Sequence, residues 1–318
     1  MTTPRFIPSL VTITQTTPFT WHLGLARSLL ALSTLLTQLF TPVGALFLRT
    51  DANPLGPTCD GFVRRATFYC LGGSAEWVDA AVVMSIVALA VVASGVLPRF
   101  TAIPHWYLSW SAATGFGLVD GGDHINAMLT AILVPIVLCD RRRTHWQQDR
   151  DYDRRSIVPK AVAHVGLLVA AIQMAVLYLI ASLSKVNVAE WADGTALWYW
   201  LSDPSFGMDA GVFSFFAPVL SNIAVLAALT YTMMALEITG ALALVFPRRA
   251  RHVVFVLLIA FHTVIAIVMG LWTFGLSMAA GLLLYLVRPG ERLDFSWVRP
   301  RRRPAAIGGD TPLLVQRD

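Results

Sequence analysis

The chain has 318 residues, of which 56% are hydrophobic and only 14% are charged, with a net charge of +5. Soluble domains carry about 25% charged residues, so this composition excludes an ordinary water-soluble enzyme, a disordered scaffold and a nucleic-acid-binding protein. The basic residues stand between apolar segments, an arrangement typical of the loops that orient membrane proteins. The ten Trp and seven Tyr fit aromatic belts at the two membrane interfaces.

Eight apolar segments are long enough, or nearly so, to cross the roughly 30 Å hydrocarbon core of a bilayer as helices. In chain order they are Leu23–Leu48, Ala80–Leu97, His105–Val119, Ile125–Cys139, Ala161–Lys185, Asn222–Phe246, Val253–Trp272 and Phe274–Val287. Several are short, so we expect some helices to be kinked or to span incompletely. The sequence predicts an all-α transmembrane bundle of about eight helices over residues 1–288, followed by a disordered, basic cytoplasmic tail over residues 289–318.

The positions of the basic residues orient these segments. If the N-terminus is inside, the inner segments hold 19 of the 24 basic residues, and the outer loops hold only Arg49, Arg64 and Arg65. The inner segments are then 1–22, 98–104, 140–160, 247–252 and 288–318. Because basic residues concentrate on the cytoplasmic side of membrane proteins, we expect a multi-pass protein of the plasma membrane. Both termini are predicted to be cytoplasmic, and the loops 49–79 and 187–215 extracytoplasmic.

Two of the three cysteines lie in the first predicted outer loop. Cys59 and Cys70 are close in sequence on the oxidising side of the membrane, which favours a disulfide between them. The pair either staples the loop or acts as an exchangeable redox pair on a secreted thiol substrate, although its spacing is not that of a Cys-x-x-Cys motif. Cys139, at the inner end of the fourth segment, is expected to be a reduced and buried small residue.

Ionisable residues inside a membrane bundle are costly and are therefore candidate functional residues. One interpretation of Arg27 and Glu237 is an interhelical ion pair that fixes the bundle. Asp120, Asp123 and His124 lie in the segment GLVDGGDHIN near the outer face. They either cap the following helix through its free N–H groups, or they contribute to a site in which the two aspartates bind substrate.

Two further ionisable residues lie within apolar segments. Lys185 ends its helix near the outer face, where it either extends to the interface or, if desolvated, serves as a base. His262 lies in the middle of its helix and is either a neutral imidazole bonded to a neighbouring group or part of a site. Since neither His-x-x-His nor Glu-x-x-His occurs on one helix, no metal site is predicted.

The loop KVNVAEWADGTALWYWLSDPSFGM mixes aromatic and acidic residues and supplies further substrate-binding candidates, namely Glu190, Trp191, Asp193 and Asp203. Ala196–Leu201 is predicted to form an amphipathic helix that lies on the membrane, closed by the Asp-Pro turn signal that follows. This arrangement would place an aromatic lid over the end of the helix that carries the lysine.

Several segments together resemble the sporulation-delaying protein B (SdpB) family. They are RSLLALSTLLTQLF, the Cys59 and Cys70 pair, PRFTAIPHWY, LVDGGDHI, DRRRTHW and EWADGTALWYWLSDPSFG. The resemblance runs from about Phe19 to Arg288. It implies a multi-pass membrane protein with an SdpA-like partner, needed for a secreted toxin precursor to become an active antimicrobial peptide.

More distantly, the bundle is similar to the HTTM (horizontally transferred transmembrane) domain of vitamin K-dependent γ-carboxylases. YLIASLSKVNVAEWADG resembles a carboxylase segment in which two adjacent lysines precede a Trp and a Gly. Lys185 matches the second lysine, the base that deprotonates the hydroquinone, and Ser184 stands at the first. His124 and His262 fall on histidines of the family's active-site region. This resemblance implies Lys185, His124 and His262 as catalytic residues and a quinone as cofactor, but the chain lacks the large lumenal domain that holds carboxylase substrates.

The sequence therefore supports three hypotheses. The first is a maturation factor for a secreted antimicrobial peptide, and the second is a quinone-linked HTTM-type oxidoreductase or carboxylase-like enzyme with Lys185 as base. The third is a non-enzymatic chaperone, immunity or export component. A neighbouring gene for a precursor with a signal peptide would favour the first over the second.

Overall fold

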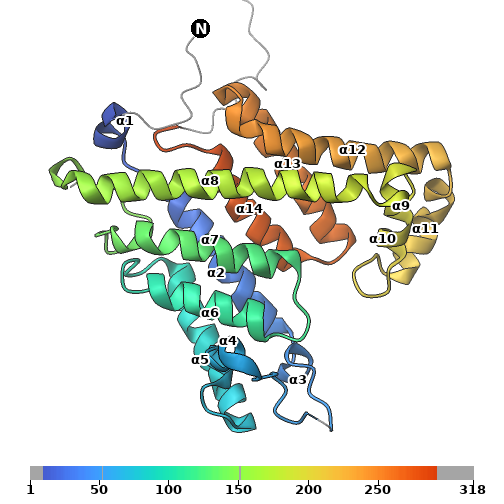
Figure 1. Cartoon of the computed structure of the whole chain (residues 1–318), viewed down its shortest axis with the longest axis horizontal. Helices are drawn as coiled ribbons and strands as arrows, with labels where there is room; N and C mark the ends of the chain where they lie inside the picture. Colours follow the sequence, from blue (N-terminus) through green and yellow to red (C-terminus); the bar gives the residue numbers. More distant parts are fainter. Residues whose placement is uncertain (1–9, 52, 150–151, 292–318) are drawn as a thin grey trace, which may run out of the picture.

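The computed structural model describes residues 10–51, 53–149 and 152–291, and the statements below concern these residues. They form fourteen α-helices and three short 3-10 helices, and no strand occurs in this part of the chain (Figure 1). The predicted disordered tail lies outside the described residues from residue 292 onward.

Eight long helices correspond one by one to the eight predicted apolar segments. They are α2 (Trp21–Phe40), α5 (Ala75–Ser94), α6 (Ala102–Gly115), α7 (Gly121–Leu138), α8 (Ile157–Val186), α12 (Ile223–Leu242), α13 (Arg248–Val268) and α14 (Trp272–Leu286). Six of them are long and apolar enough to cross a membrane, whereas α6 and α14, with 14 and 15 residues, are shorter. The predicted all-α membrane bundle is confirmed.

Short helices occupy the connections. They are α1 (Leu10–Gln15), α3 (Val43–Leu46), α4 (Gly61–Arg65), η1 (Phe68–Cys70), η2 (Tyr152–Arg154), α9 (Ala189–Ala192), α10 (Ala196–Ser202), α11 (Ala210–Leu220) and η3 (Ala243–Val245). The helix expected at Ala196–Leu201 is confirmed as α10. Together α9, α10 and α11 form a compact segment at the C-terminal end of α8 (Figure 1).

The outer surface of the bundle is apolar, as a lipid-facing surface must be. On α5, for example, Val83, Val87 and Val91 are exposed at a spacing of one helical turn, with exposed fractions of 61%, 59% and 45%. Such a stripe would be a liability in water, but in a bilayer it lies against acyl chains of the same polarity. The exposure pattern therefore supports a multi-pass membrane protein.

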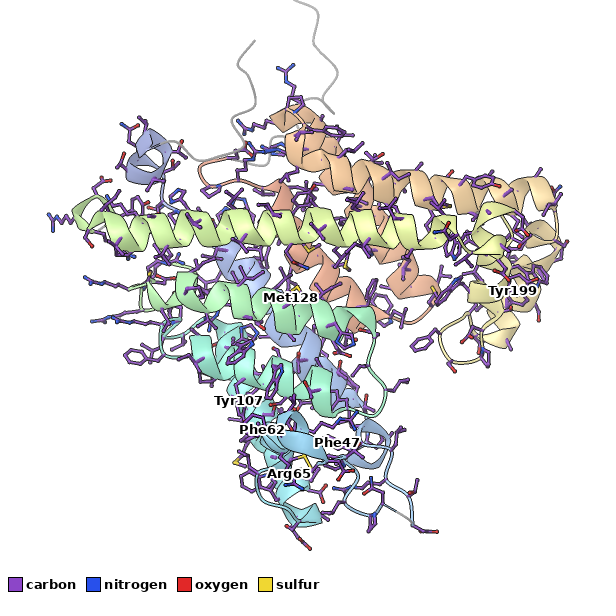
Figure 2. All side chains as sticks on the ribbon, in the orientation of Figure 1. Phe47, Phe62, Arg65, Tyr107, Met128 and Tyr199 are labelled. Atoms are coloured by element: carbon purple, nitrogen blue, oxygen red, sulfur yellow. A yellow bond between two sulfur atoms is a disulfide. The ribbon has the colours of Figure 1, made fainter. Side chains whose placement is uncertain are left out.

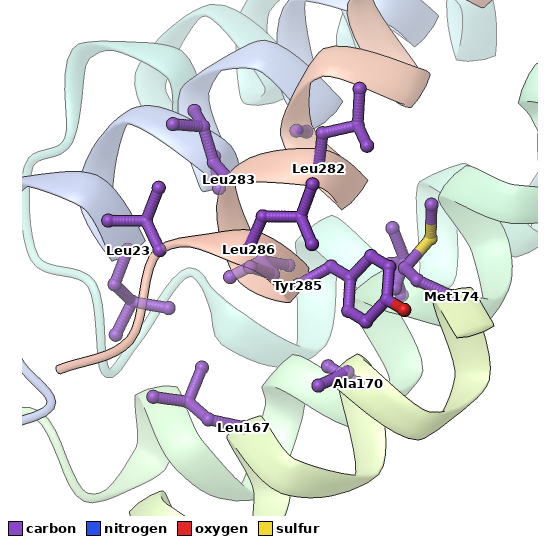
Figure 3. Packing of buried hydrophobic residues seen from close by; sticks show 14 of the residues in the cluster. Leu23, Leu167, Ala170, Met174, Leu282, Leu283, Tyr285 and Leu286 are labelled. Carbon is purple, nitrogen blue, oxygen red and sulfur yellow. The ribbon is translucent and has the colours of Figure 1, made fainter. Parts of the chain in front are cut away.

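The centre of the bundle is built around α14, which packs between α2 and α8 (Figure 3). Leu286 of α14 lies among the buried side chains of Leu23 and Leu167, which belong to these two neighbours. Because lipid is as apolar as leucine, such contacts stabilise the bundle mainly through close packing. The hydroxyl of Tyr285 also donates to the carbonyl of Gly240 at 2.8 Å, which ties α14 to α12.

The loop between α7 and α8 is closed by a buried ion pair that explains the start of the DRRRTHW segment. The Arg142 guanidinium lies 2.8 Å from the carboxylate of Asp140, and both side chains are almost fully buried. The same guanidinium donates to the backbone carbonyls of His145 and Gln147 at 2.8 and 2.7 Å. Arg142 thus satisfies carbonyls that the turn would otherwise bury without partners.

His145 fastens this loop to the neighbouring helices. Its ring lies so close to Gly24 of α2 and to Gly95 that an added Cβ would come within 2.8 and 2.4 Å of ring atoms. Its Nε2 lies 3.1 Å from the Ser28 hydroxyl, within hydrogen-bond distance. Burial, and secondarily the charge of Arg27, lowers the pKa of His145 to about 4. The histidine of this motif therefore has a structural role as a neutral side chain.

The predicted disulfide is confirmed, since Cys59 and Cys70 are bonded across α4 and η1. Cys139 is free and half-buried. The loop packs on α6, where the Tyr107 hydroxyl donates to the Ala66 carbonyl at 2.8 Å. Figure 2 shows Phe62 of this loop well away from the α9–α11 segment, so the loop is a separate feature from the cavity described next.

Candidate functional site

A cavity of about 890 Å³ lies between the C-terminal half of α8 and helices α7, α12, α13 and α14, with α10 at its edge. Its walls are almost entirely apolar. The ionisable or strongly polar side chains along it are His124, Gln173, Tyr178, Lys185, Glu237 and His262. The structure therefore brings the three candidate catalytic residues, Lys185, His124 and His262, to one cavity.

Lys185 points into the bundle and pairs with Glu237 of α12. Its ammonium lies 2.7 Å from both carboxylate oxygens of Glu237 and donates to the Ala181 carbonyl at 3.1 Å. The Trp191 ring lies 5.0 Å from the same nitrogen, close enough for a cation–π contact. The side chains of Lys185 and Glu237 are only 15% and 8% exposed. Lys185 thus lies at the cavity wall instead of extending to the interface.

The suggested ion pair between Arg27 and Glu237 is wrong. Arg27 instead donates to the Thr101 hydroxyl at 2.7 Å, and Glu237 pairs with Lys185. The physical reason is the stagger of two helices, since α12 begins beyond the end of α8 and runs back alongside it (Figure 1). This stagger brings the second half of α12 level with the last turns of α8.

His262 of α13 faces Tyr178 of α8 across the cavity wall. Its Nε2 lies 2.9 Å from the Tyr178 hydroxyl, within hydrogen-bond distance. Its ring also makes an edge contact with Phe274 of α14 at 5.6 Å between ring centres. The other ring nitrogen, Nδ1, is buried and has no hydrogen-bond partner among the described residues. One nitrogen of His262 is therefore held in place while the other stays unpaired.

The α9–α10 segment, for which the sequence predicts an aromatic lid over the end of the lysine-bearing helix, lies at one edge of the cavity. Trp191 and Trp200 line the cavity, and Trp191 is 6% exposed. The segment is fastened to α12, where Thr230 donates to the Gly194 carbonyl at 3.0 Å. At this point Gly194 adopts a φ of +85°, a conformation that favours glycine.

Of the acidic candidates in this loop, two shape its backbone. The Asp193 carboxylate accepts from the backbone N–H and the hydroxyl of Thr195 at 3.0 and 2.6 Å. The Asp203 carboxylate accepts from the N–H groups of Ser205 and Phe206 at 2.8 and 2.9 Å, which closes the SDPSFG turn. Glu190 is exposed. These three carboxylates are absent from the described cavity wall, which leaves Trp191 as the loop candidate that lines it.

Asp120 and Asp123 form the N-terminal cap of α7. Asp120 accepts from the N–H groups of Gly122 and Asp123 at 2.7 and 3.1 Å, and Asp123 accepts from the Asp120 N–H at 3.2 Å. This reciprocal arrangement is a capping box, so both carboxylates serve the helix start. The cap places His124, the next residue, at the cavity.

Glu237 as the partner of Lys185 was missed by the sequence analysis, and so was Tyr178. A signal for Tyr178 exists, because it precedes Lys185 by seven residues, two helical turns, and therefore shares its helix face. Within residues 10–51, 53–149 and 152–291, no cluster of three His, Cys, Asp or Glu residues is placed to hold a metal ion.

Comparisons with known proteins agree with this architecture. The HTTM domain family matches residues 74–288, a range that includes every residue of the cavity wall. Sporulation-delaying protein SdpB of Bacillus subtilis (strain 168) is 32% identical over 300 residues, which cover 91% of this chain and 90% of the relative. The uncharacterized protein YitO of the same organism is 29% identical over 289 residues, or 89% of this chain and 90% of the relative. No solved structure matches the chain. The chain belongs to the HTTM domain family and, within it, to the SdpB family.

Proposed function

We propose that the protein is required for the production of a secreted SDP-like antimicrobial peptide, and that it acts on the peptide precursor at the extracytoplasmic face. Membership of the SdpB family supports this function. The observation that carries the proposal is the cavity that Lys185, Glu237 and His262 all line, with aromatic side chains at its edge. The basic-residue distribution predicts that this aromatic edge, within residues 187–215, is extracytoplasmic.

The cavity suits an apolar segment of a precursor peptide. Its volume of about 890 Å³ accommodates several aliphatic or aromatic side chains, and its wall offers matching apolar contacts. Trp191 and Trp200 restrict the entry of water at one edge. Against such apolar walls the charges of Lys185 and Glu237 act on a bound substrate more strongly than they would in water.

The Lys185–Glu237 pair favours a chemical role over a purely structural one. A proton that moves from the ammonium to the carboxylate along the 2.7 Å hydrogen bond leaves a neutral amine at the cavity wall. That amine is a competent base or nucleophile. Tyr178 holds His262 at the same wall, so two nitrogen groups face one substrate space.

A quinone-linked enzyme is the second candidate function, and the cavity fits such a group. A quinone ring and the start of its isoprenoid chain need an apolar space with a few polar groups, and the unpaired Nδ1 of His262 and the ammonium of Lys185 are such groups. When bound, the ring supplies electron transfer. In this case Lys185 and Glu237 hold or move a proton at Nζ, His262 orients the ring, and Trp191 excludes water.

Mass spectrometry of the secreted peptide tests the proposed function. Cells carry the precursor and the SdpA-like partner, with or without this protein, and mature peptide is expected only with the protein. The identical mature peptide in its absence would refute the proposal. Glu237→Gln is compared with Glu190→Gln, the same substitution at an exposed position outside the cavity. Loss of maturation in Glu237→Gln alone, at equal membrane abundance of the two folded variants, supports a chemical role, whereas normal maturation in both variants indicates a non-enzymatic export or immunity component.

Extraction of the purified protein distinguishes the second candidate. A quinone recovered in about equal amount to the protein, and lost in His262→Gln, would favour the quinone-linked function. A wild-type protein that releases no quinone above the level of an unrelated membrane protein would exclude a resident quinone.

A further inference from the structure

A second cavity, of about 880 Å³, lies at the opposite end of α8, in the loop that joins it to α7. Five arginines line it, from two short stretches of the loop. They are Arg141, Arg142, Arg143, Arg154 and Arg155. The remaining described lining consists of two glutamines and one carboxylate, Asp149. The cavity therefore gathers a large excess of positive charge in one place.

Two of the arginines are fixed and nearly buried at the cavity wall. The side chains of Arg142 and Arg155 are 3% and 5% exposed. Arg142 is held by its pair with Asp140. Arg155 lies 3.0 Å from Asp149 and donates to the Cys139 carbonyl at 2.7 Å. The wall of the cavity is thus organised before any ligand arrives.

Unused donors remain at this wall. The Nε of Arg155 is buried and has no hydrogen-bond partner within the described part of the chain. The side chains of Arg141 and Arg143 are exposed, and neither guanidinium makes a hydrogen bond or ion pair with described residues. Membrane orientation requires only positive charge in the loop and does not require buried, oriented guanidinium groups around one space. The geometry therefore points to an anionic ligand.

The chemistry and the position of the site identify the class of ligand. Planar guanidinium groups match the oxygen atoms of a phosphate in bidentate geometry. The cavity lies directly beside the start of α8, where Ile157 and Val158 are exposed. Exposed Trp146 is in the same loop, as expected of a residue at a membrane interface. A ligand that combines a phosphodiester with acyl chains fits both the basic cavity and these apolar neighbours.

We propose that this cavity binds the phosphodiester headgroup of an anionic phospholipid. Basic pockets between transmembrane helices are known to recognise such headgroups. The site is independent of the proposed function, because it lies at the other end of α8 from Lys185. A free phosphate group shares the recognition chemistry, and the test below separates the two sources.

The test uses the full-length protein, delipidated in a neutral detergent and titrated with short-chain phosphatidylglycerol or phosphatidylcholine in native mass spectrometry. We expect one phosphatidylglycerol per chain and no comparable binding of phosphatidylcholine. The double variant Arg141→Gln/Arg143→Gln should bind about twenty-five-fold more weakly, since each basic residue near an anionic lipid contributes about fivefold. The matched control is Arg248→Gln/Arg249→Gln, which removes two exposed charges at the start of α13, outside the cavity, and should bind as the wild type does.

Equal binding of the two lipids, or equal losses in the two double variants, would overturn the proposal. Competition by inorganic phosphate separates the sources: displacement at millimolar phosphate indicates a site for free phosphate, and persistence of the lipid indicates a headgroup site. An intact Cys59–Cys70 disulfide and an unchanged unfolding temperature verify that each variant is folded. If the cavity variant does not fold, the comparison of the two lipids on the unmodified protein still decides the outcome.

Discussion

Replacement of Glu237 by Gln removes one charge of the Lys185–Glu237 pair and keeps the shape of the side chain. Removal of one partner from a buried pair costs about 3–5 kcal/mol, because the other charge stays buried without compensation. The Lys185 side chain retains 15% exposure and a cation–π contact with Trp191. We therefore expect the low end of this range, a loss of about 3 kcal/mol in the free energy of unfolding.

The double variant Lys185→Met/Glu237→Gln provides the comparison. Methionine has a volume similar to that of lysine and leaves no charge in the apolar cavity. We expect the double variant to unfold within about 1 kcal/mol of the wild type. Lys185→Met alone leaves the Glu237 charge unpaired and should lose a similar amount. The losses of the two single variants should therefore sum to far more than the loss of the double variant.

The assay is reversible unfolding in mixed micelles of a mild detergent and dodecyl sulfate, followed by tryptophan fluorescence. Glu190→Gln, at an exposed position, is the control and should change the free energy of unfolding by less than about 0.5 kcal/mol. If the losses of the two single variants simply add in the double variant, the side chains of Lys185 and Glu237 do not form an ion pair at the cavity wall.

Three further predictions concern the rest of the molecule. In a background without free cysteine, an impermeant thiol reagent added to intact cells should label Ser205→Cys and should not label Asp153→Cys; the reverse pattern would contradict the orientation. Cys59→Ser/Cys70→Ser should expose the loop to trypsin, because the disulfide stabilises it by about 3 kcal/mol in the chain-entropy model, while the unfolding temperature of the bundle stays close to that of the wild type. Burial lowers the pKa of His145 from 6.5 to about 4 in the folded protein. As the pH is lowered, the unfolded chain therefore takes up a proton on this histidine at a higher pH than the folded protein does. The free energy of unfolding should fall as the pH drops from about 6.5 to 4. If the His145→Gln variant shows the same fall as the wild type, protonation of His145 is not its cause.

The helices of this protein are well predicted from its sequence because a bilayer allows few alternatives. Each apolar segment must satisfy its own backbone hydrogen bonds, so each becomes a helix, and local signals then fix several ends. Asp120, for example, starts α7 through its capping box. The disulfide between Cys59 and Cys70 is also predictable, since the two thiols are close in sequence within one loop.

The side-chain pairs between helices at the cavity are less predictable, because they depend on the relative position of two helices along their axes. The sequence predicts Lys185 near the outer face and pairs Glu237 with Arg27 instead of with this lysine. The stagger of α12 against α8 brings Lys185 and Glu237 to 2.7 Å. Apolar helix surfaces pack at many relative depths with similar energy, so hydropathy alone does not show this stagger. Contacts that set it, such as that of Thr230 with the Gly194 carbonyl, join residues far apart in sequence.

We propose that Lys185 performs proton chemistry on a bound substrate in this cavity. Lys185→Arg keeps the positive charge and the reach of the side chain, but arginine does not release its proton because its pKa stays above about 12. Lys160, the chain's other lysine, lies in the first turns of the same helix, so Lys160→Arg is the matched control. The measurement is the amount of mature secreted peptide, by mass spectrometry, at equal membrane abundance of the variants. We expect mature peptide with Lys160→Arg and none with Lys185→Arg. Wild-type amounts of mature peptide with Lys185→Arg would refute the role of Lys185 as a base.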